Sequence, residues 1–559
     1  MATIDSRLLF VTTSPRSPEK MIPEIELLDR YFNGQEWNHA TQVAFMSVLR
    51  NEDFFQGSGA KDPAFSARDR INRGPKSLGF VNLKPTVSLT PAGMRFISSE
   101  FPGEVLLRQM LKFQIPSPYH KPSASAAKFN VRPFLEILRL VRVLEKLRFD
   151  ELRIIALQLT DWHSFEYIVH KIHDFRNAKI HNTGNYRVFA EKYLENELRN
   201  IFADRIEVGN VKTRENADTS VANFLATQAR NTRDYADAFF RYLRATGLVA
   251  VSHIGKSLTI VPERIEEVDY ILNTIPRDAF AFKDEISYSH YLGDDTIPEL
   301  LPDNREYISG RISREFPDIV TDRNADAVTL RKRYASLLLK RKSRTMARLI
   351  DSLKNYSEYD DIQMIFDRIV DKKIYDAPLM LEWNTWRAMT MIDGGDIAAN
   401  LKFDDYGNPM CTAQGNMPDI VCDYGDFMVC VEVTMQSGQR QFETEHESVL
   451  RHLGKLKVSS DRPCYTLFIA PDINPSCITY FYTMHHVNLA LYGGTSVIVP
   501  LPLGLFRHLL ARSFSGHVKV TPRHIRSIFD MSMKYAMASD NEQEWFNRLC
   551  DEVQHIFSA

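Results

Sequence analysis

The chain has 559 residues, of which 44% are hydrophobic and 25% are charged, and its formal net charge is −2 at pH 7. This length exceeds one ordinary hydrophobic core and favours about two to four domains, and the composition excludes a disordered chain. No apolar run is long enough to span a membrane, and the small net charge excludes a globally basic surface, so a nucleic-acid partner would need a local basic patch.

The cysteine pattern predicts the compartment. All the cysteines lie in the last third of the chain without a CxxC pair, at positions 411, 422, 430, 464, 477 and 550. This spacing is typical of core thiols in a reduced compartment rather than of disulfides or a zinc knuckle. The N-terminus also lacks the basic and apolar parts of a signal peptide. We therefore expect a cytoplasmic protein with no membrane contact.

Residues 1–275 alternate helical patterns with short strands. Residues 67–76 predict the basic end of a helix, which a Gly-Pro pair terminates. A predicted hairpin over residues 78–90 follows. A helix followed by a hairpin is the arrangement of a winged helix-turn-helix. This part of the chain therefore predicts a first winged-helix-like subdomain.

The same order recurs further along the chain. An amphipathic helix over residues 235–244 precedes a predicted hairpin over residues 248–261, and a proline-rich connector lies at residues 115–122. We therefore predict two winged-helix-like subdomains of α+β structure, at about 1–125 and 126–275.

Residues 276–375 read as mostly helical and highly charged. From Arg331 to Leu349 there are eight Lys and Arg residues and no Asp or Glu. One interpretation is a helix that lies on nucleic-acid phosphates. The other interpretation, which the sequence alone favours, is a solvated helix face in an interdomain linker.

Residues 376–559 have an α/β pattern. The candidate strands are 418–423, 428–434, 464–470 and 495–500, and the candidate helices are 378–392, 441–458, 477–490, 502–512 and 523–556. Strands that alternate with helices predict a mixed central sheet flanked by helices.

Two acids in this region, Asp419 and Glu432, lie in short apolar strands separated by turn residues, which predicts a β-hairpin. An acid on an apolar strand is costly to bury unless it is paired or binds a cation, and two such acids repel each other. The pattern indicates a Mg²⁺ site for phosphodiester cleavage. The alternative is a surface turn with one solvated Asp and one Glu on an edge strand.

Two predicted helices carry further acids. Glu382 lies beside the apolar stripe of its helix, and Glu445 shares a helix face with His452. A helix acid would complete a Mg²⁺ site with the strand acids, and a nearby Arg or His would contact phosphate. The alternatives are an N-terminal acid favoured by the helix dipole for Glu382 and a solvated helix start for Glu445.

Asp419, twelve intervening residues, Glu432 and the trailing Thr434 resemble the PD-(D/E)xK nuclease signature, with Thr where Lys usually stands. With residues 381–388 and 437–452, this variant is similar to the AlwI-type family of type IIS restriction endonucleases. Segments resembling the MlyI and PleI branch of that family are 13–16, 68–73, 116–120, 130–133 and 235–241.

The resemblance implies a DNA-recognition domain over residues 1–275, a helical linker domain over 276–375 and a C-terminal PD-(D/E)xK nuclease domain over 376–559. Such an enzyme binds a short asymmetric duplex site, GAGTC in the MlyI and PleI branch, and cuts a few base pairs to one side with Mg²⁺. It would work in a bacterial cytoplasm as part of a restriction-modification system.

The resemblance also implies roles for the acids. Asp419 and Glu432 would be the metal ligands, Glu382 and Glu445 the supporting active-site acids, and His452 a further candidate. The missing Lys leaves open whether metal-bound water suffices or His452 assists it.

Arginine pairs bidentately with guanine, and lysine more often holds a phosphate. The candidates for DNA contact are therefore Arg68, Arg70, Arg73 and Lys76 in the first subdomain and Arg241 in the second, with Arg233 and Arg244 beside it. The competing interpretation is that these side chains form salt bridges with Asp69 or Asp237.

The predicted partner is double-stranded DNA. One nuclease module faces one strand, so we expect a monomer that dimerises transiently on DNA for double-strand cleavage, whereas a chain that fails to dimerise would only nick. The alternatives are a DNA-binding regulator with an inactive nuclease fold, disfavoured because all four acids are present, and a single-strand or RNA nuclease, disfavoured because no aromatic-basic stripe is found.

Overall fold

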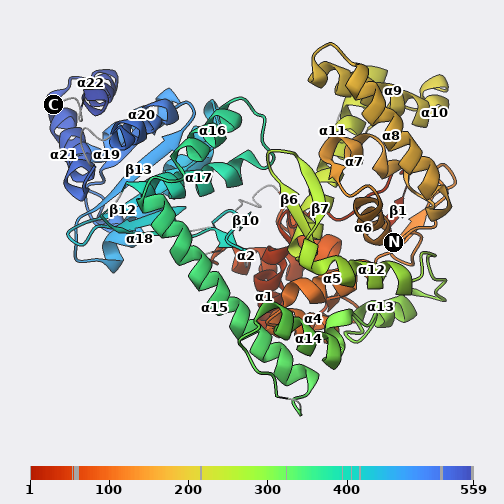
Figure 1. The fold of residues 1–559 in the computed structure, drawn as a ribbon. Coiled ribbons are helices and arrows are strands. Elements are labelled where there is room, and N and C mark those ends of the chain that lie inside the picture. Colours follow the sequence, from red (N-terminus) through yellow and green to blue (C-terminus); the bar gives the residue numbers. More distant parts are fainter. Residues whose placement is uncertain are drawn as a thin grey trace. The chain divides into compact units, whose positions relative to one another are not determined.

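The computed structural model separates into two compact units (Figure 1), one of residues 1–50 and 58–336 and the other of residues 51–57 and 337–559. The described residues are 2–4, 6–52, 54–55, 62–213, 217–322, 324–392, 394–404, 406–413, 417–515 and 520–555. The domain boundaries predicted near residues 275 and 375 stay predictions.

The first unit is mainly helical. Its helices of eight residues or more are α1 (Met21–Phe32), α2 (His39–Arg50), α3 (Pro63–Ile71), α4 (Pro91–Ser98), α5 (Pro102–Lys112), α6 (Pro133–Val143), α8 (Phe165–His181), α9 (Tyr186–Ile201), α11 (Val221–Ala245), α12 (Ile265–Thr274), α13 (Glu285–Gly293) and α14 (Arg305–Glu315). Shorter helices are α7 (Phe149–Ile154) and α10 (Ala203–Glu207). The strands pair as β1 (Ala2–Ile4) with β4 (His120–Pro122), β2 (Val81–Asn82) with β3 (Ser88–Leu89), and β5 (Leu147–Arg148) with β7 (Ser257–Ile260) and β6 (Val249–Ser252).

The two predicted helix-then-hairpin segments are confirmed as local structure. Asp62 caps α3 by accepting a hydrogen bond from the Phe65 backbone N–H, and a wider helical turn at Asn72–Lys76 continues it. The antiparallel pair β2–β3 follows α3, and the antiparallel pair β6–β7 follows α11. The winged-helix assignment of both segments stays a prediction.

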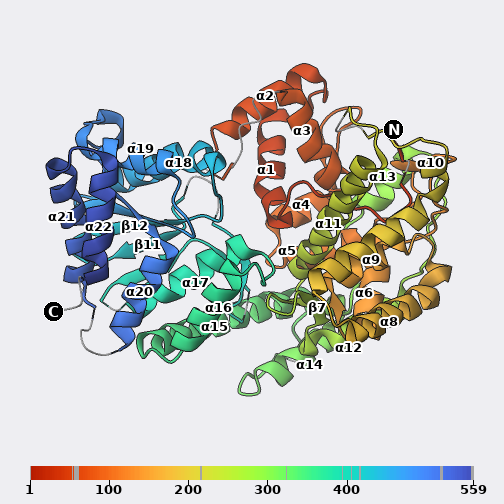
Figure 2. The same cartoon turned by 90° about the horizontal axis from the view of Figure 1, so that it is seen from above.

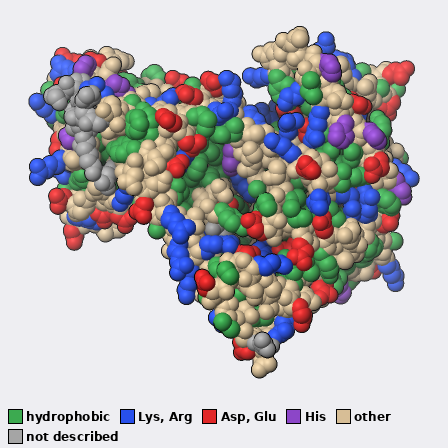
Figure 3. Space-filling model, in the orientation of Figure 1, with side chains coloured by type: hydrophobic (Ala, Val, Ile, Leu, Met, Phe, Trp, Pro, Cys, Tyr) green, Lys and Arg blue, Asp and Glu red, His purple; other side chains and the backbone are tan. Residues whose placement is uncertain are grey.

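The charged region between residues 276 and 375 is helical, as predicted. The long helix α15 (Ala327–Lys354) contains the whole basic run, and α16 (Tyr359–Val370) follows it. Lys and Arg side chains gather along α15 on the face shown in Figure 3.

The second unit is built on a mixed five-stranded sheet with the strand order β14-β13-β12-β11-β8. The strands are β8 (Asp396–Ala399), β11 (Ile420–Asp423), β12 (Met428–Val433), β13 (Cys464–Ala470) and β14 (Ile498–Pro502), and a separate pair is β9 (Lys402–Phe403) with β10 (Pro409–Cys411). β12, β13 and β14 run parallel to one another, whereas β11 is antiparallel to both β12 and β8. The predicted mixed central sheet is confirmed.

Helices cover both faces of this sheet. Figure 2 shows α18 (Gln439–Ser459) and α19 (Pro475–His486) on one face and α16 and α17 (Ala377–Met391) on the other. α20 (Leu503–Phe514) also packs on β13 and β14. The buried Trp386 side chain fixes α17 to the sheet, because its indole N–H donates to the Ile397 carbonyl at 3.1 Å.

The single helix predicted over residues 523–556 is wrong. The structure has two helices there, α21 (Pro522–Ala538) and α22 (Glu542–His555). The short polar residues between them explain the break, since the Asn541 side chain accepts a hydrogen bond from the Glu544 backbone N–H and caps α22.

The cysteines are free thiols, as predicted, and all except the half-buried Cys550 are buried. Among the described residues, no helix combines the length and the hydrophobicity that crossing a bilayer requires.

Candidate active site

Asp419 and Glu432 lie across from each other on the β11–β12 hairpin. Ile420 pairs with Val431, so Asp419, directly before Ile420, faces Glu432, directly after Val431. The hairpin turns at Gly425, whose φ of 83° favours glycine and whose N–H donates to the Asp423 side chain. The predicted hairpin is therefore confirmed.

Glu432 lies in the interior of the sheet, and Asp419 directly precedes β11. β12 lies between β11 and β13, so Glu432 is on a central strand, where it is 6% exposed, and not on an edge strand. Asp419 is half-buried, and its Oδ2 accepts a hydrogen bond of 2.8 Å from the Val433 backbone N–H. The pair is therefore held in place by strand geometry and a backbone donor.

The helix acids approach the same place from both faces of the sheet. Glu382 on α17 is buried, and its Oε2 accepts a hydrogen bond of 2.9 Å from the Ala413 backbone N–H. Glu445 on α18 is half-buried, and its Oε1 accepts a hydrogen bond of 2.9 Å from the Thr434 hydroxyl. The structure therefore brings together all four acids that the sequence singled out.

The acids of this cluster repel one another. Burial raises the pKa of Asp419 well above its ordinary value, and the charges of Glu432 and Glu445 raise it further. The pKa of Glu432 is raised well above its ordinary value by burial, then by Glu445 and Glu382. Such a site favours a bound cation or bound protons, because either one removes the repulsion between carboxylates.

His452 belongs to the same cluster. Its Nδ1 lies 2.8 Å from Glu432 Oε1, and burial with the nearby Arg451 and Lys455 charges lowers its pKa to about 4. The imidazole is therefore neutral at pH 7, and its Nδ1 shares a hydrogen bond with the Glu432 carboxyl group. Arg451 instead forms an ion pair of 2.7 Å with Glu447.

Thr434, at the position where the signature usually has Lys, contacts the cluster through its hydroxyl. The hydroxyl donates to Glu445 and accepts a hydrogen bond of 3.0 Å from the Gln436 backbone N–H. Sequence reasoning noted Thr434 only as a departure, and it missed the backbone donors at Val433 and Ala413. No residue type marks a backbone N–H, so these donors have no sequence signal.

The donor set fits Mg²⁺, which suits hard oxygen ligands and usually takes one or two protein carboxylates together with water and phosphate. Asp419 and Glu432 provide such a pair, and their mutual repulsion gives a cation an electrostatic reason to bind. In the described part of the chain, no three His, Cys, Asp or Glu side chains are grouped so that they would hold a metal ion by themselves.

The predicted DNA-contact residues of the first unit differ in their surroundings. Arg70 forms an ion pair with the buried Glu24, and Arg73 forms one of 2.6 Å with Asp69. Arg68 is exposed and forms no ion pair with any acid that the structure describes.

Two further candidates are partly withdrawn from solvent. The Lys76 ammonium lies 4.4 Å from the centre of the Tyr119 ring, and burial lowers its pKa. The Arg241 side chain is buried and forms an ion pair of 2.8 Å with Asp237. The predicted pairing of these basic residues with Asp69 and Asp237 is therefore found at Arg73 and Arg241.

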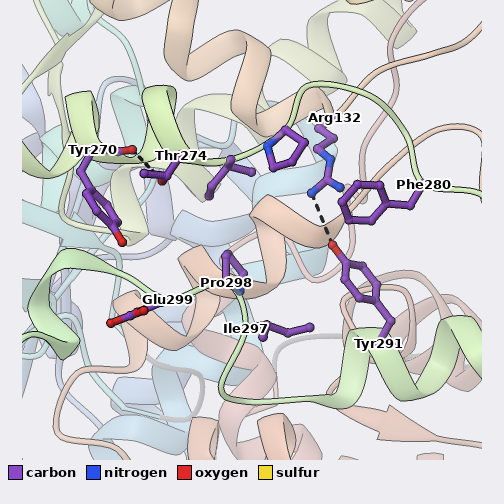
Figure 4. Close-up of a pocket in the computed structure, with 10 residues that line it drawn as sticks. Arg132, Tyr270, Thr274, Phe280, Tyr291, Ile297, Pro298 and Glu299 are labelled. Carbon is purple, nitrogen blue, oxygen red and sulfur yellow. Dashed lines mark hydrogen bonds between the residues drawn. The ribbon is translucent and has the colours of Figure 1, made fainter.

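A cavity of about 270 Å³ lies in the first unit, apart from the acids (Figure 4). Arg132 lines it, but its guanidinium donates to the Leu111 carbonyl, the Asp278 carbonyl and the Tyr291 hydroxyl. The Thr274 hydroxyl likewise donates to the Tyr270 carbonyl. Because these polar groups bind one another across the walls of the cavity, we interpret the cavity as structural and not as a ligand site.

The sequence matches the family model of the AlwI restriction endonuclease over residues 76–509. No curated protein matches the chain.

Two solved structures resemble parts of the chain. The small subunit of the heterodimeric restriction endonuclease R.BspD6I is 23% identical, over 34% of this chain and 98% of that chain, with a TM-score of 0.29. The BpuJ1 endonuclease binding domain, solved with pyrene- and phenanthrene-modified DNA, is 12% identical, over 51% of this chain and 97% of that chain, with a TM-score of 0.32.

Proposed function

The chain belongs to the AlwI restriction endonuclease family, and on this premise we propose that it is a type IIS restriction endonuclease that cuts duplex DNA with Mg²⁺. It binds a short asymmetric site, GAGTC, and hydrolyses the backbone a few base pairs to one side. The observation that carries the proposal is the cluster of two buried acids, Glu432 and Glu382, and two half-buried ones, Asp419 and Glu445, whose charges repel one another.

In this proposal Asp419 and Glu432 would hold the metal. A bound Mg²⁺ supplies positive charge to the phosphate and acidifies a water molecule. The Val433 N–H holds the Asp419 carboxyl group, and the His452 imidazole holds that of Glu432. A PD-(D/E)xK arrangement of these residues is part of the proposal, with Thr434 in place of Lys.

Glu445 acts as the proton acceptor for the attacking water. Burial raises its pKa, which makes its carboxylate a stronger base at neutral pH than an exposed glutamate. The Thr434 hydroxyl occupies one of its oxygens and thereby fixes the direction of the other. Glu382, anchored by the Ala413 N–H, contributes negative charge that strengthens cation binding.

The first unit recognises the site, and the second unit cuts one strand. The chain is a monomer in solution. Double-strand cleavage then requires a second copy that joins transiently on DNA.

The test is incubation of the full chain with supercoiled plasmid and Mg²⁺, followed by run-off sequencing of the product ends. Ends at a fixed distance to one side of GAGTC establish the proposed activity, and the ratio of linear to open-circular product separates a cutting enzyme from a nicking one. Plasmid that stays intact while site-specific binding is retained would instead identify a DNA-binding regulator.

The Thr434→Val variant is expected to cleave about 10- to 100-fold more slowly, since it removes an outer partner that orients an active-site carboxylate. Thr434→Ser is the matched control and should keep most of the activity, because it retains the hydroxyl. Single-turnover cleavage at saturating protein measures both rates. Equal rates for the Val and Ser variants would show that the contact with Glu445 has no role.

Arg68→Ala is expected to weaken specific DNA binding by about 1–3 kcal/mol. A shift assay with a GAGTC duplex measures it, beside Arg187→Ala, which removes another exposed arginine from α9. Arg70→Ala is a poorer test, because it would leave the buried Glu24 without its ion-pair partner. If Arg68→Ala and Arg187→Ala bind alike, Arg68 does not contact the DNA.

A further inference from the structure

Three basic residues form a stripe on α15 in the second unit. Lys340, Arg344 and Arg348 follow one another at intervals of four residues, which aligns them on one side of a helix. All three are exposed, and none forms an ion pair with an acid in the described ranges. Figure 3 shows basic side chains gathered along this helix.

The opposite side of α15 is fixed to the second unit. The Lys342 ammonium donates to the Phe403 carbonyl at 2.6 Å from this side. Beside the stripe, the Arg341 guanidinium lies 5.2 Å from the Tyr406 ring centre. Leu338 and Leu353 are buried. The stripe of Lys340, Arg344 and Arg348 therefore has a fixed orientation away from the core.

The charge pattern of α15 does not fit a face that is merely solvated. A solvated helix face normally alternates charges, because opposite charges four residues apart stabilise a helix and like charges destabilise it. Here like charges recur at that spacing, and no acid stands between residues 331 and 349. An anionic partner would remove the repulsion.

The stripe is linked to the acid cluster by packing within one unit. Lys342 on α15 binds the Phe403 carbonyl on β9, and the Phe403 ring packs on Trp386 at a centroid distance of 5.2 Å. Trp386 lies one helical turn after Glu382 on α17. The basic stripe and the acid cluster therefore belong to one packed unit, and the same DNA can contact both.

We propose that Lys340, Arg344 and Arg348 bind the phosphate backbone of the DNA that lies outside the recognition sequence. The inference rests on the proposed function and adds a contact surface to it. The stripe is about 12 Å long at 1.5 Å per residue, and phosphates recur about every 3.4 Å of axis on each strand, so the stripe spans roughly three to four phosphates of one strand. Contacts of this kind do not read sequence.

The test is the salt dependence of DNA binding by the full chain in Ca²⁺, which replaces Mg²⁺ so that cleavage does not interfere. The stripe variant carries Lys340→Gln and Arg344→Gln. The control variant carries Arg523→Gln and Lys534→Gln, which likewise removes one Lys and one Arg, from exposed positions of α21 in the same unit. One duplex carries GAGTC with 25 base pairs on each side, and a second ends two base pairs beyond the site.

On the long duplex, the slope of log K against log salt should become shallower by about 1.8 in the stripe variant, at about 0.9 for each lost phosphate contact. It should stay unchanged in the control variant. On the short duplex, both variants should match the wild-type chain.

Two failures are distinguishable. A wild-type chain that binds neither duplex contradicts the proposed function itself. A wild-type chain that binds and cleaves, with the same slope in the stripe variant on the long duplex, overturns the inference about α15 alone. A slope change that persists on the short duplex would also overturn it, because the contact would then lie within the recognition sequence.

Discussion

The Asp419→Asn variant is expected to bind DNA normally and to lose cleavage by more than about 100-fold, which exceeds the loss that follows from changing an outer partner of a metal ligand. The substitution keeps the size of the side chain and removes the negative charge. Without that charge the proposed Mg²⁺ site retains one strand carboxylate, and the phosphate loses the cation that would neutralise it. Plasmid cleavage and a shift assay measure the two activities separately.

The sign of the accompanying stability change follows from the electrostatics. Because the pKa of Asp419 is raised in the folded chain, its ionisation destabilises the metal-free fold once the pH exceeds the unfolded pKa of about 3.9. At pH 7 without Mg²⁺, Asp419→Asn should therefore melt no lower than the wild-type chain. Added Mg²⁺ should raise the melting temperature of the wild-type chain more than that of the variant.

Asp423→Asn is the matched control for this experiment. Asp423 lies at the other end of β11, where its carboxylate binds Arg462 at 2.6 Å. The same chemical change there should leave cleavage near the wild-type rate. Full cleavage by Asp419→Asn, or equal losses in both variants, would contradict the assignment of Asp419 as a metal ligand.

Trp386→Ala is expected to reduce the free energy of unfolding by about 3–5 kcal/mol, the usual range for removing a large buried aromatic side chain. Trp386 is 1% exposed, packs on Phe403 and donates its indole N–H to the Ile397 carbonyl. Its loss would open a cavity between α17 and the sheet and leave that carbonyl unpaired. Denaturant unfolding followed by tryptophan fluorescence and circular dichroism measures the change.

Trp386→Phe separates packing from the hydrogen bond, because it keeps a ring and removes the N–H. Its loss should be smaller than that of Trp386→Ala. Since α17 also carries Glu382, the alanine variant should lose cleavage at temperatures where the wild-type chain is still folded. A Trp386→Ala chain with unchanged stability would show that the contact between α17 and β8 is not part of the core.

Local structure in the second unit was predictable from the sequence. Asp419 directly precedes β11 and Glu432 lies in β12, and both strands are short apolar segments around a turn. Neighbouring residues set their pairing. Glu445 and His452 share a face because of helical periodicity. The sequence pattern did not predict the break between α21 and α22, because apolar periodicity resumes after it. The residue that marks the break is Asn541, which caps α22.

Contacts between distant residues were not predictable in the same way. Arg70 was a candidate for DNA contact, but it pairs with Glu24, which lies 46 residues away in sequence. Glu382 is held by the Ala413 backbone, 31 residues away. Such partners are decided by how helices and loops meet in three dimensions, and a single sequence carries no local pattern for them.

The placement of the cysteines has a practical consequence for single-molecule work. The first unit has no cysteine, five thiols of the second unit are buried, and burial raises the pKa of Cys550 to about 11. Native thiols therefore react slowly with maleimides at neutral pH, because the thiolate is the reactive form. A cysteine introduced at one exposed position of the first unit would take up a fluorophore selectively and report on that unit as DNA binds.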